Sequence, residues 1–160
     1  MSGLFELVLY VYPLYFNLVF MTLLIGFNIS LVINAKIYLN DNYTKEELIG
    51  VYKHFVYKHL IFIFISLFAY GVMLFGIYDF DSSNPFYSSV RTIVMVLFLF
   101  MCVNYIYIII RTYILRQNII KDEPIVCVEN FAIVIYYFVC LNIVVCFALL
   151  FLNILLMRLY

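Results

Sequence analysis

The sequence has few charged side chains, and this scarcity excludes an ordinary soluble domain. Charged residues make up 11% of the 160 residues and hydrophobic residues 68%, whereas soluble domains have about 25% charged and roughly 45–50% apolar residues. A water-soluble core cannot bury so much apolar surface in a short chain, but a bilayer surrounds it with hydrocarbon. The composition therefore predicts a membrane protein.

Other absences exclude further classes. The formal net charge is zero, so we expect no nucleic-acid partner. The cysteines form no C-x-x-C pair, which argues against a thiol oxidoreductase or a zinc clamp. The start, MSGLFELVLYVYP, lacks a basic n-region and a cleavage signal, so the first helix is expected to stay in the mature protein. Tryptophan is absent while Tyr, Phe, Ile, Asn and Lys abound, which suggests an AT-rich bacterial genome.

Long apolar runs are what the sequence has instead. A spanning helix needs about 20 predominantly apolar residues, whereas barrel strands would alternate. We predict an all-α polytopic membrane protein, with four transmembrane helices in an antiparallel bundle, over residues 13–36, 59–78, 90–115 and 127–157. Pro13 suits a first helical position, after an interfacial turn. The second helix is expected to begin well before the membrane, at Thr44, because Glu47 follows three residues later.

Basic residues predict which way the helices face. Lys and Arg concentrate in the first and third connections, and positive flanks stay in the cytoplasm. The bundle is therefore expected to lie in a bacterial inner membrane, N-out and C-out, with the lipid bilayer as its main partner. The basic residues of these two connections are Lys36, Lys45, Lys53, Lys58, Arg111, Arg116 and Lys121.

Polar residues inside the spans are candidates for helix packing or for a solute path. Asparagine in hydrocarbon needs a partner, so each is expected to face another helix. Thr22, Gly26 and Ser30 recur every four residues, and this small-residue ridge predicts close approach either in a homodimer or larger complex, or against the fourth span. The main intramembrane asparagines are Asn17, Asn28, Asn104 and Asn142.

Two ionisable residues are candidates for catalysis or substrate binding. Glu129 follows Asp122-Glu123-Pro124 near the cytoplasmic side, where hydration or an ion pair with a nearby arginine competes with a proton-transfer role. Arg91 opens the third span beside the acidic loop DFDSSNPFYSS. Pairing with an aspartate there competes with an outward-facing ion site.

The only two histidines lie in VYKHFVYKHL. A metal or haem pair on one helix requires a spacing of three or four residues. His54 and His59 are five apart, so an unbroken α-helix would separate their rings by about 140°. We therefore expect no metal site, and the two rings stay candidates only for a five-coordinate haem or a mixed ligand set. The repeated Tyr-Lys is interpreted as an interfacial collar.

Several motifs together carry a family resemblance. They are the basic residue in SSVRTIVMVLFLF, the Asn-Tyr in MCVNYIYIIIR, the polar loop RQNIIKDEP and the segment VENFAIV. This layout resembles the copper-resistance-D-like membrane proteins and the related J-type protoporphyrinogen oxidases. The resemblance implies a haem-associated redox site with histidines in the first and third helices and a basic residue opening the third. Arg91 matches that basic residue, while YVYPLYFNLVF has no histidine and Asn104-Tyr105 occupies the other position.

These observations predict an integral inner-membrane protein with a non-enzymatic role, as a membrane subunit or a small transport-related protein, without a cofactor. Two alternatives stay open. The first is a haem-pathway redox enzyme of the J type, in which Arg91, Glu129 and one of His54 and His59 are the candidates for binding porphyrin carboxylates or moving protons. The second is a permease for a small solute or ion, in which Asn17, Asn28 and Asn142 line one cavity.

Overall fold

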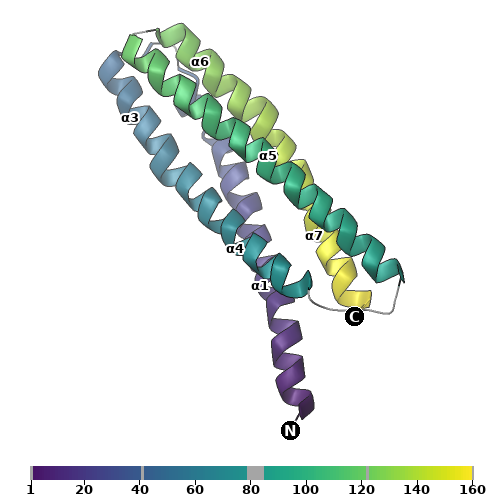
Figure 1. Ribbon diagram of the computed structural model, residues 1–160. Helices are drawn as coiled ribbons and strands as arrows, with labels where there is room; N and C mark the ends of the chain where they lie inside the picture. The colour runs from purple at the N-terminus through teal and green to yellow at the C-terminus, as the bar shows by residue number, and fades with distance from the viewer. Residues whose placement is uncertain (1, 41, 79–84, 122, 160) are drawn as a thin grey trace.

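The computed structural model describes residues 2–40, 42–78, 85–121 and 123–159, and the regular structure of these residues is entirely helical (Figure 1). Four stretches of the described chain are long and apolar enough to cross a bilayer, which makes this a multi-pass membrane protein. The elements are α1 (Ser2–Ile33), α2 (Ala35–Tyr38), α3 (Lys45–Phe55), the π-helical turn η1 (Val56–Leu60), α4 (Ile61–Tyr78), α5 (Pro85–Lys121), α6 (Pro124–Ala132), the π-helical segment η2 (Ile133–Val139) and α7 (Cys140–Leu159).

The predicted start of the first helix is wrong. A start at Pro13 was expected, but α1 begins at Ser2 and runs through the proline. Transmembrane helices tolerate an interior proline, because one missing N–H group breaks only a local hydrogen bond. At the other end, α1 stops at Ile33. The Asn34 amide then donates to the Ser30 carbonyl at 2.7 Å, and the short α2 follows.

The predicted start of the second helix is confirmed. The Thr44 side chain accepts from the backbone N–H of Glu47, and the Glu47 carboxylate accepts from the backbone N–H of Thr44 at 2.8 Å. This reciprocal pair satisfies two donors that a helix start leaves unbonded. The helix continues from there through η1 into α4, so the second span has a polar first part outside the apolar stretch.

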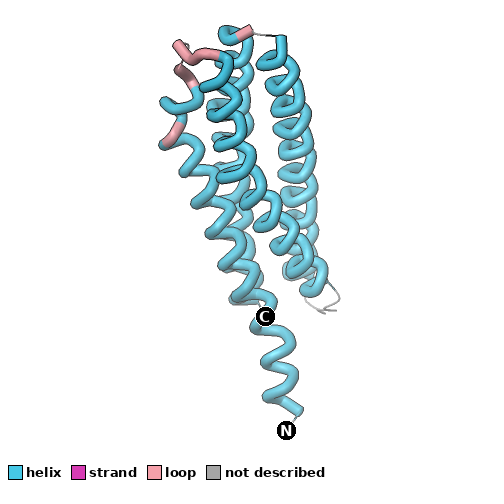
Figure 2. Tube along the Cα trace, turned by 90° about the vertical axis from the view of Figure 1, so that its left-hand side faces the viewer, coloured by secondary structure: helices cyan, strands magenta, loops and turns pink. Residues whose placement is uncertain are grey.

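The helices pack unevenly around the bundle. The main contacts of α1 are with α4 and α7, and those of α5 are with α6 and α7. Loops gather at the end where α3 begins and α5 finishes, while both termini lie toward the other end (Figure 2). Because neither α4 nor α5 is the other's main partner, the α4–α5 side is the loosest part of the bundle.

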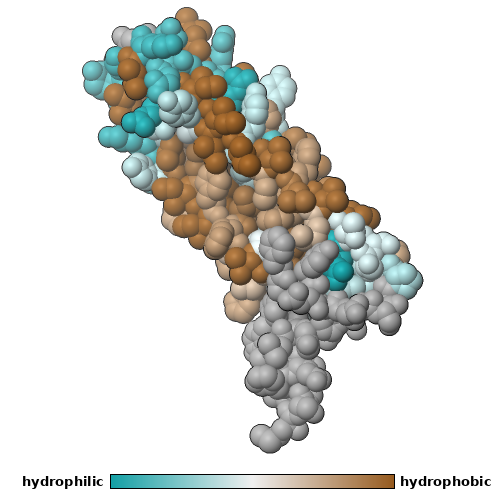
Figure 3. All heavy atoms as spheres, in the orientation of Figure 1, coloured by the Kyte–Doolittle hydropathy of each residue, from teal (hydrophilic) through white to brown (hydrophobic). Residues whose placement is uncertain are grey.

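The surface is apolar and the interior is partly polar. Phe68 is 75% exposed and Ile33 74%, whereas Asn17, Asn28 and Asn142 are 0% exposed. Figure 3 shows a hydrophobic band along the middle of one face and hydrophilic side chains at the α3 end. In water this arrangement would be unstable, but in a bilayer the apolar side chains face lipid and the amides face one another.

Candidate functional site

A cluster of rings closes the loop-bearing end of the bundle. Tyr38 of α2 is fully buried, and its ring lies against Phe55 of α3 and Phe131 of α6, with centroid distances of 5.4 and 5.6 Å. The two histidines complete the cluster. The centroid of Tyr38 is 6.1 Å from that of His54 and 6.0 Å from that of His59.

The predicted separation of the two histidine rings is wrong. Their centroids are only 5.8 Å apart, because the chain between them is not an α-helix. In η1 the Ile61 N–H bonds to the Val56 carbonyl, five residues back. A π turn of this kind places residues five positions apart on nearly the same face. The two imidazoles therefore belong to one cluster rather than to different sides of the helix.

The polar atoms of this cluster are only partly satisfied. The Tyr38 hydroxyl lies 2.9 Å from Nδ1 of His54. Burial raises the pKa of Tyr38 to about 12, so the phenol stays protonated at neutral pH and can donate to that nitrogen. Nδ1 of His59 is buried and has no hydrogen-bond partner. The cluster therefore has one ring nitrogen, on His59, that is free to make a hydrogen bond.

A complete metal site is not present in the described part of the chain. No three His, Cys, Asp or Glu side chains of the described residues lie together as a metal-ligating group. Two imidazoles and a phenol form a partial ligand set, and a stable structural or catalytic site takes at least three protein ligands. The haem candidates His54 and His59 are brought together, but the structure adds no third ligand of these types.

Side-chain amides and one tyrosine hydroxyl link three helices in the part of the interior nearer the two termini. Asn17 of α1 donates to the side-chain oxygen of Asn153 of α7 at 3.4 Å. Asn153 in turn donates to the Tyr70 hydroxyl of α4 at 3.0 Å. All three residues are 0% exposed. One chain of hydrogen bonds thus joins α1, α7 and α4.

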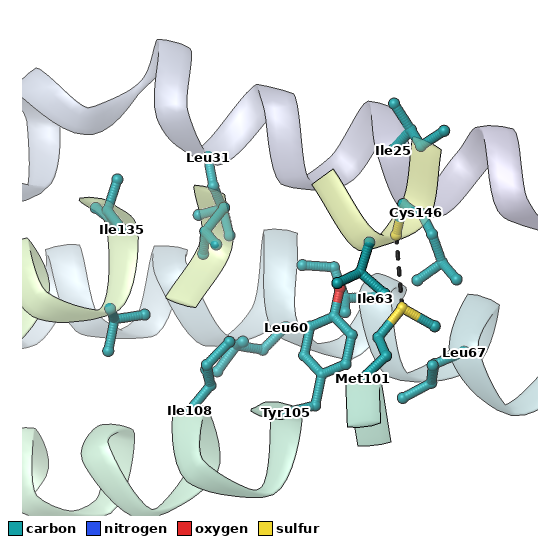
Figure 4. Packing of buried hydrophobic residues seen from close by; sticks show 14 of the residues in the cluster. Ile25, Leu31, Leu60, Ile63, Leu67, Met101, Tyr105, Ile108, Ile135 and Cys146 are labelled. Carbon is teal, nitrogen blue, oxygen red and sulfur yellow. Dashed lines mark hydrogen bonds between the residues drawn. The ribbon is translucent and has the colours of Figure 1, made fainter. Parts of the chain in front are cut away.

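A second set of bonds ties α5 to the helices opposite it. Asn28 of α1 donates to the Tyr105 hydroxyl at 2.7 Å, and Asn104 donates to the side-chain oxygen of Asn142 of α7. Figure 4 shows Tyr105 beside the sulfur pair formed by Cys146 and Met101, in which the thiol lies 3.5 Å from the thioether. Each of these contacts crosses from one helix to another.

Three amide atoms of this interior have no partner. They are Oδ1 of Asn17, Oδ1 of Asn28 and Nδ2 of Asn142. Each lies on a side chain whose other amide atom is bonded across the bundle. A buried unsatisfied polar atom costs free energy, so these are the places where a water or a small polar ligand would be stabilised.

The two ionisable candidates lie outside this interior. Glu129 is exposed on α6, and the Arg111 guanidinium instead donates to the Asn130 side chain at 3.3 Å and to the Tyr107 hydroxyl at 2.8 Å. Arg91 is half-buried in the first turns of α5. The aspartates expected beside it, at positions 79 and 81, lie outside the described residues.

The small-residue ridge does not contact another helix of this chain at its centre. Thr22 and Gly26 are exposed and Ser30 is half-buried. A Cβ added at Gly26 would meet no atom within 4 Å, so the alternative in which the ridge packs onto the fourth span is not what the structure has. The asparagine side of α1 packs inward, and the ridge side faces outward. Association through this ridge stays a prediction.

Sequence reasoning missed the tyrosines of the interior. Tyr38, Tyr70 and Tyr105 each pair with a histidine or an asparagine, but the chain has 16 tyrosines and nothing in composition separates these three. One local signal was present, because Tyr105 directly follows Asn104 in the middle of an apolar run.

Comparison of this chain with protein-family models, curated proteins and solved structures gives no match. The likeness to copper-resistance-D-like proteins therefore rests on the sequence motifs alone.

Proposed function

We propose that this protein is a non-enzymatic subunit of a bacterial inner-membrane assembly, with antiparallel helices and both termini outside. The observation that carries the proposal is the use of the interior amides. Asn17, Asn28 and Asn104 each bond to a side chain on another helix, so the polar groups hold the bundle together.

The strength of these bonds suits a structural role. Interhelical hydrogen bonds in membranes contribute about 0.6 kcal/mol on average and up to about 1.7 kcal/mol. These three links join the first, third and fourth spans, and the bond from Asn153 to Tyr70 adds the second. Together the four bonds add a few kcal/mol to a bundle that has no hydrophobic effect between its helices. The outward ridge around Gly26, where a Cβ would meet no atom within 4 Å, supports a subunit role because another helix can approach its backbone closely.

Charge distribution supports the proposed orientation. Lys45, Lys53 and Arg116 lie at the loop-bearing end, where the α3 and α5 ends meet, and Arg158 ends α7 at the other. An excess of basic residues marks the cytoplasmic side. Reporter fusions to the two termini test this orientation. We expect both to report the outer side, and a cytoplasmic signal from either terminus would reverse it.

The subunit proposal is tested by reconstituting the purified chain into liposomes and by native mass analysis after gentle solubilisation. We expect a mass above that of one chain, from a second copy or a partner subunit, and proton or solute flux equal to that of protein-free liposomes. A solely monomeric mass together with flux above the background would contradict the proposal.

A second candidate, permeation of a proton or a small polar solute, is favoured by the unpartnered atoms of Asn17, Asn28 and Asn142. A solute that moves through the interior could form a hydrogen bond with each of these atoms in turn. Under this candidate, liposome flux is present in the unmodified chain, and Asn142→Leu lowers it while helical content and insertion stay unchanged. Flux that is insensitive to Asn142→Leu would remove this path.

A further inference from the structure

A groove lined by residues of the second span and of α5 runs along the seam between them. A first hollow of about 540 Å³ lies at the loop-bearing end. A second hollow of about 330 Å³ shares Tyr52, Val56 and Arg116 with the first. A third hollow of about 370 Å³ shares Phe64 with the second. The three hollows therefore follow one another along the seam, from the polar end into the apolar part.

Helix packing explains why the groove is there. The second span packs mainly against α1, and α5 packs mainly against α6 and α7. The second span and α5 come close where the Phe98 ring lies against Gly71, since a Cβ at Gly71 would lie 2.8 Å from Cζ of Phe98. Toward the polar end the two helices touch again at the rings of Phe64 and Tyr105, whose centroids are 6.2 Å apart, and at the bond from Lys45 to the Ile120 carbonyl. The hollows lie along this seam.

The polar end of the groove is built from one face of each helix. On α3, Lys45, Ile49, Tyr52 and Lys53 follow one another at spacings of four, three and one, which places them on one side of a helix. Arg116 lies opposite on α5. The Lys45 ammonium donates to the Ile120 carbonyl at 3.1 Å, which holds it across the mouth, and an ammonium has two further N–H groups to donate.

Charge in the groove has one sign. Lys45, Lys53 and Arg116 line the polar end, and no acidic side chain is among the described residues that line it. Farther along, the lining is apolar, with Phe64, Leu67 and Phe68 around the third hollow. The groove thus changes from cationic to fully apolar along its length, as a phospholipid changes from phosphate to acyl chain.

We propose that this groove binds one anionic phospholipid of the leaflet next to α3. Its phosphate lies between Lys45, Lys53 and Arg116, and one acyl chain follows the seam past Phe64 toward Gly71. From Val56 to Gly71 the helix rises about 22 Å, which exceeds the roughly 15 Å depth of one leaflet. An acyl chain anchored at the polar end therefore finds apolar lining along its whole length. Basic pockets between transmembrane helices bind anionic headgroups in this way.

The absence of tryptophan from the sequence makes a direct test practical. Tyr57→Trp places a single fluorophore in the polar end of the groove, at a position that is 64% exposed, and Tyr137→Trp places one on η2, at a position that is 71% exposed and does not line the groove. Each variant is reconstituted into vesicles of phosphatidylglycerol and phosphatidylcholine in fixed proportion, with bromine on the acyl chains of one lipid or the other. Bromine quenches the fluorophore on contact.

At position 57 we expect brominated phosphatidylglycerol to quench several-fold more than its bulk fraction allows, and at position 137 we expect quenching to follow the bulk fractions. Because each position is compared only with itself, differences in membrane depth cancel. Equal quenching by the two lipids at position 57 would overturn the proposal.

Neutralising the cations provides the second arm. In the Tyr57→Trp background, Lys45→Gln, Lys53→Gln and Arg116→Gln together are expected to lower the preference for phosphatidylglycerol about tenfold, since each cation near a headgroup surface contributes about fivefold and neighbours are not additive. The matched control neutralises three lysines at the same end of the bundle that are exposed and do not line the groove, Lys36, Lys58 and Lys121, and should retain the preference.

Three outcomes would contradict the proposal. The first is a preference that survives the groove variant, and the second is a preference lost equally in the control, which would indicate general surface charge. The third is loss of the preference in millimolar inorganic phosphate at constant ionic strength, which would indicate a soluble anion as the ligand. The proposed lipid site lies at the seam between the second span and α5, away from the interior asparagines. It therefore holds whichever of the two candidate functions is correct.

Discussion

The bonded interior and the α4–α5 seam differ in what holds their helices together. In the interior, hydrogen bonds between amides and hydroxyls link α1, α7, α4 and α5. At the seam, aromatic rings of the second span pack against aromatic rings of α5. Tyr70 and Phe98 have centroids 5.5 Å apart, and Phe64 and Tyr105 6.2 Å apart. The comparison teaches that hydrogen bonds of the interior reach across the bundle, also between helices that are not each other's main packing partners, whereas the seam rests on ring contacts.

The largest effect is expected from the three-residue chain of the interior. Asn153→Leu removes the acceptor for Asn17 and the donor to Tyr70, and both would then be buried without a partner. We expect a loss of about 2 kcal/mol in the free energy of unfolding, measured by steric trapping in bicelles. The control Thr22→Val alters an exposed hydroxyl on α1 that bonds only to the Leu18 carbonyl. Equal losses of stability in the two variants would contradict the claim that the interior hydrogen bonds stabilise the bundle more than an exposed one does.

Smaller changes in stability are expected from alanine substitutions at two glycines, a loss at one and no change or a gain at the other. Gly71→Ala places a methyl group 2.8 Å from the Phe98 ring and should lower stability by about 1 kcal/mol because the ring must shift. Gly26→Ala meets no atom within 4 Å and should leave stability unchanged or raise it by up to about 1 kcal/mol through helix propensity.

The glycine comparison can be sharpened with a second change at the seam. Phe98→Leu should restore most of the stability that Gly71→Ala loses, since the shorter side chain leaves room for the methyl group. Equal losses for Gly71→Ala and Gly26→Ala in the isolated monomer would show that the seam is not in contact at this point.

The smallest effect is expected from the ionisation of Tyr38, in the ring cluster at the loop-bearing end of the bundle. Its pKa is raised to about 12 by burial, whereas an unfolded tyrosine ionises near 10. Between pH 10 and 12 the unfolded chain therefore holds fewer protons, and stability falls as pH rises. Tyr38→Phe should lack this part of the fall, and its phenolate absorbance should match that of the unmodified chain until about pH 11. A difference between the two near pH 10 would mean that Tyr38 is solvated.

Some of this structure follows from the sequence, and the reasons are local. Apolar runs predict the four spans, because spanning a bilayer depends mainly on length and hydrophobicity. The Thr44–Glu47 capping box is predictable because all its groups lie within one helical turn. The predicted start at Pro13 was wrong because membrane helices accept an interior proline.

The histidine cluster lay beyond prediction for a different reason. Its geometry depends on one extra residue in the η1 turn, and the energy of such a turn is set by the packing around it rather than by its own residues. Tyr38, which bonds to His54 at 2.9 Å, comes from another helix. An angular count along a single ideal helix contains neither fact.

The central claim, that the interior amides hold the helices together, is tested most directly by a double-mutant cycle on Asn104 and Asn142, which bond α5 to α7. Stability of the unmodified chain, Asn104→Leu, Asn142→Leu and the double variant is measured by steric trapping. We expect the two single losses to overlap, with a coupling free energy of about 1 kcal/mol. Losses that simply add, or single variants as stable as the unmodified chain, would contradict the claim.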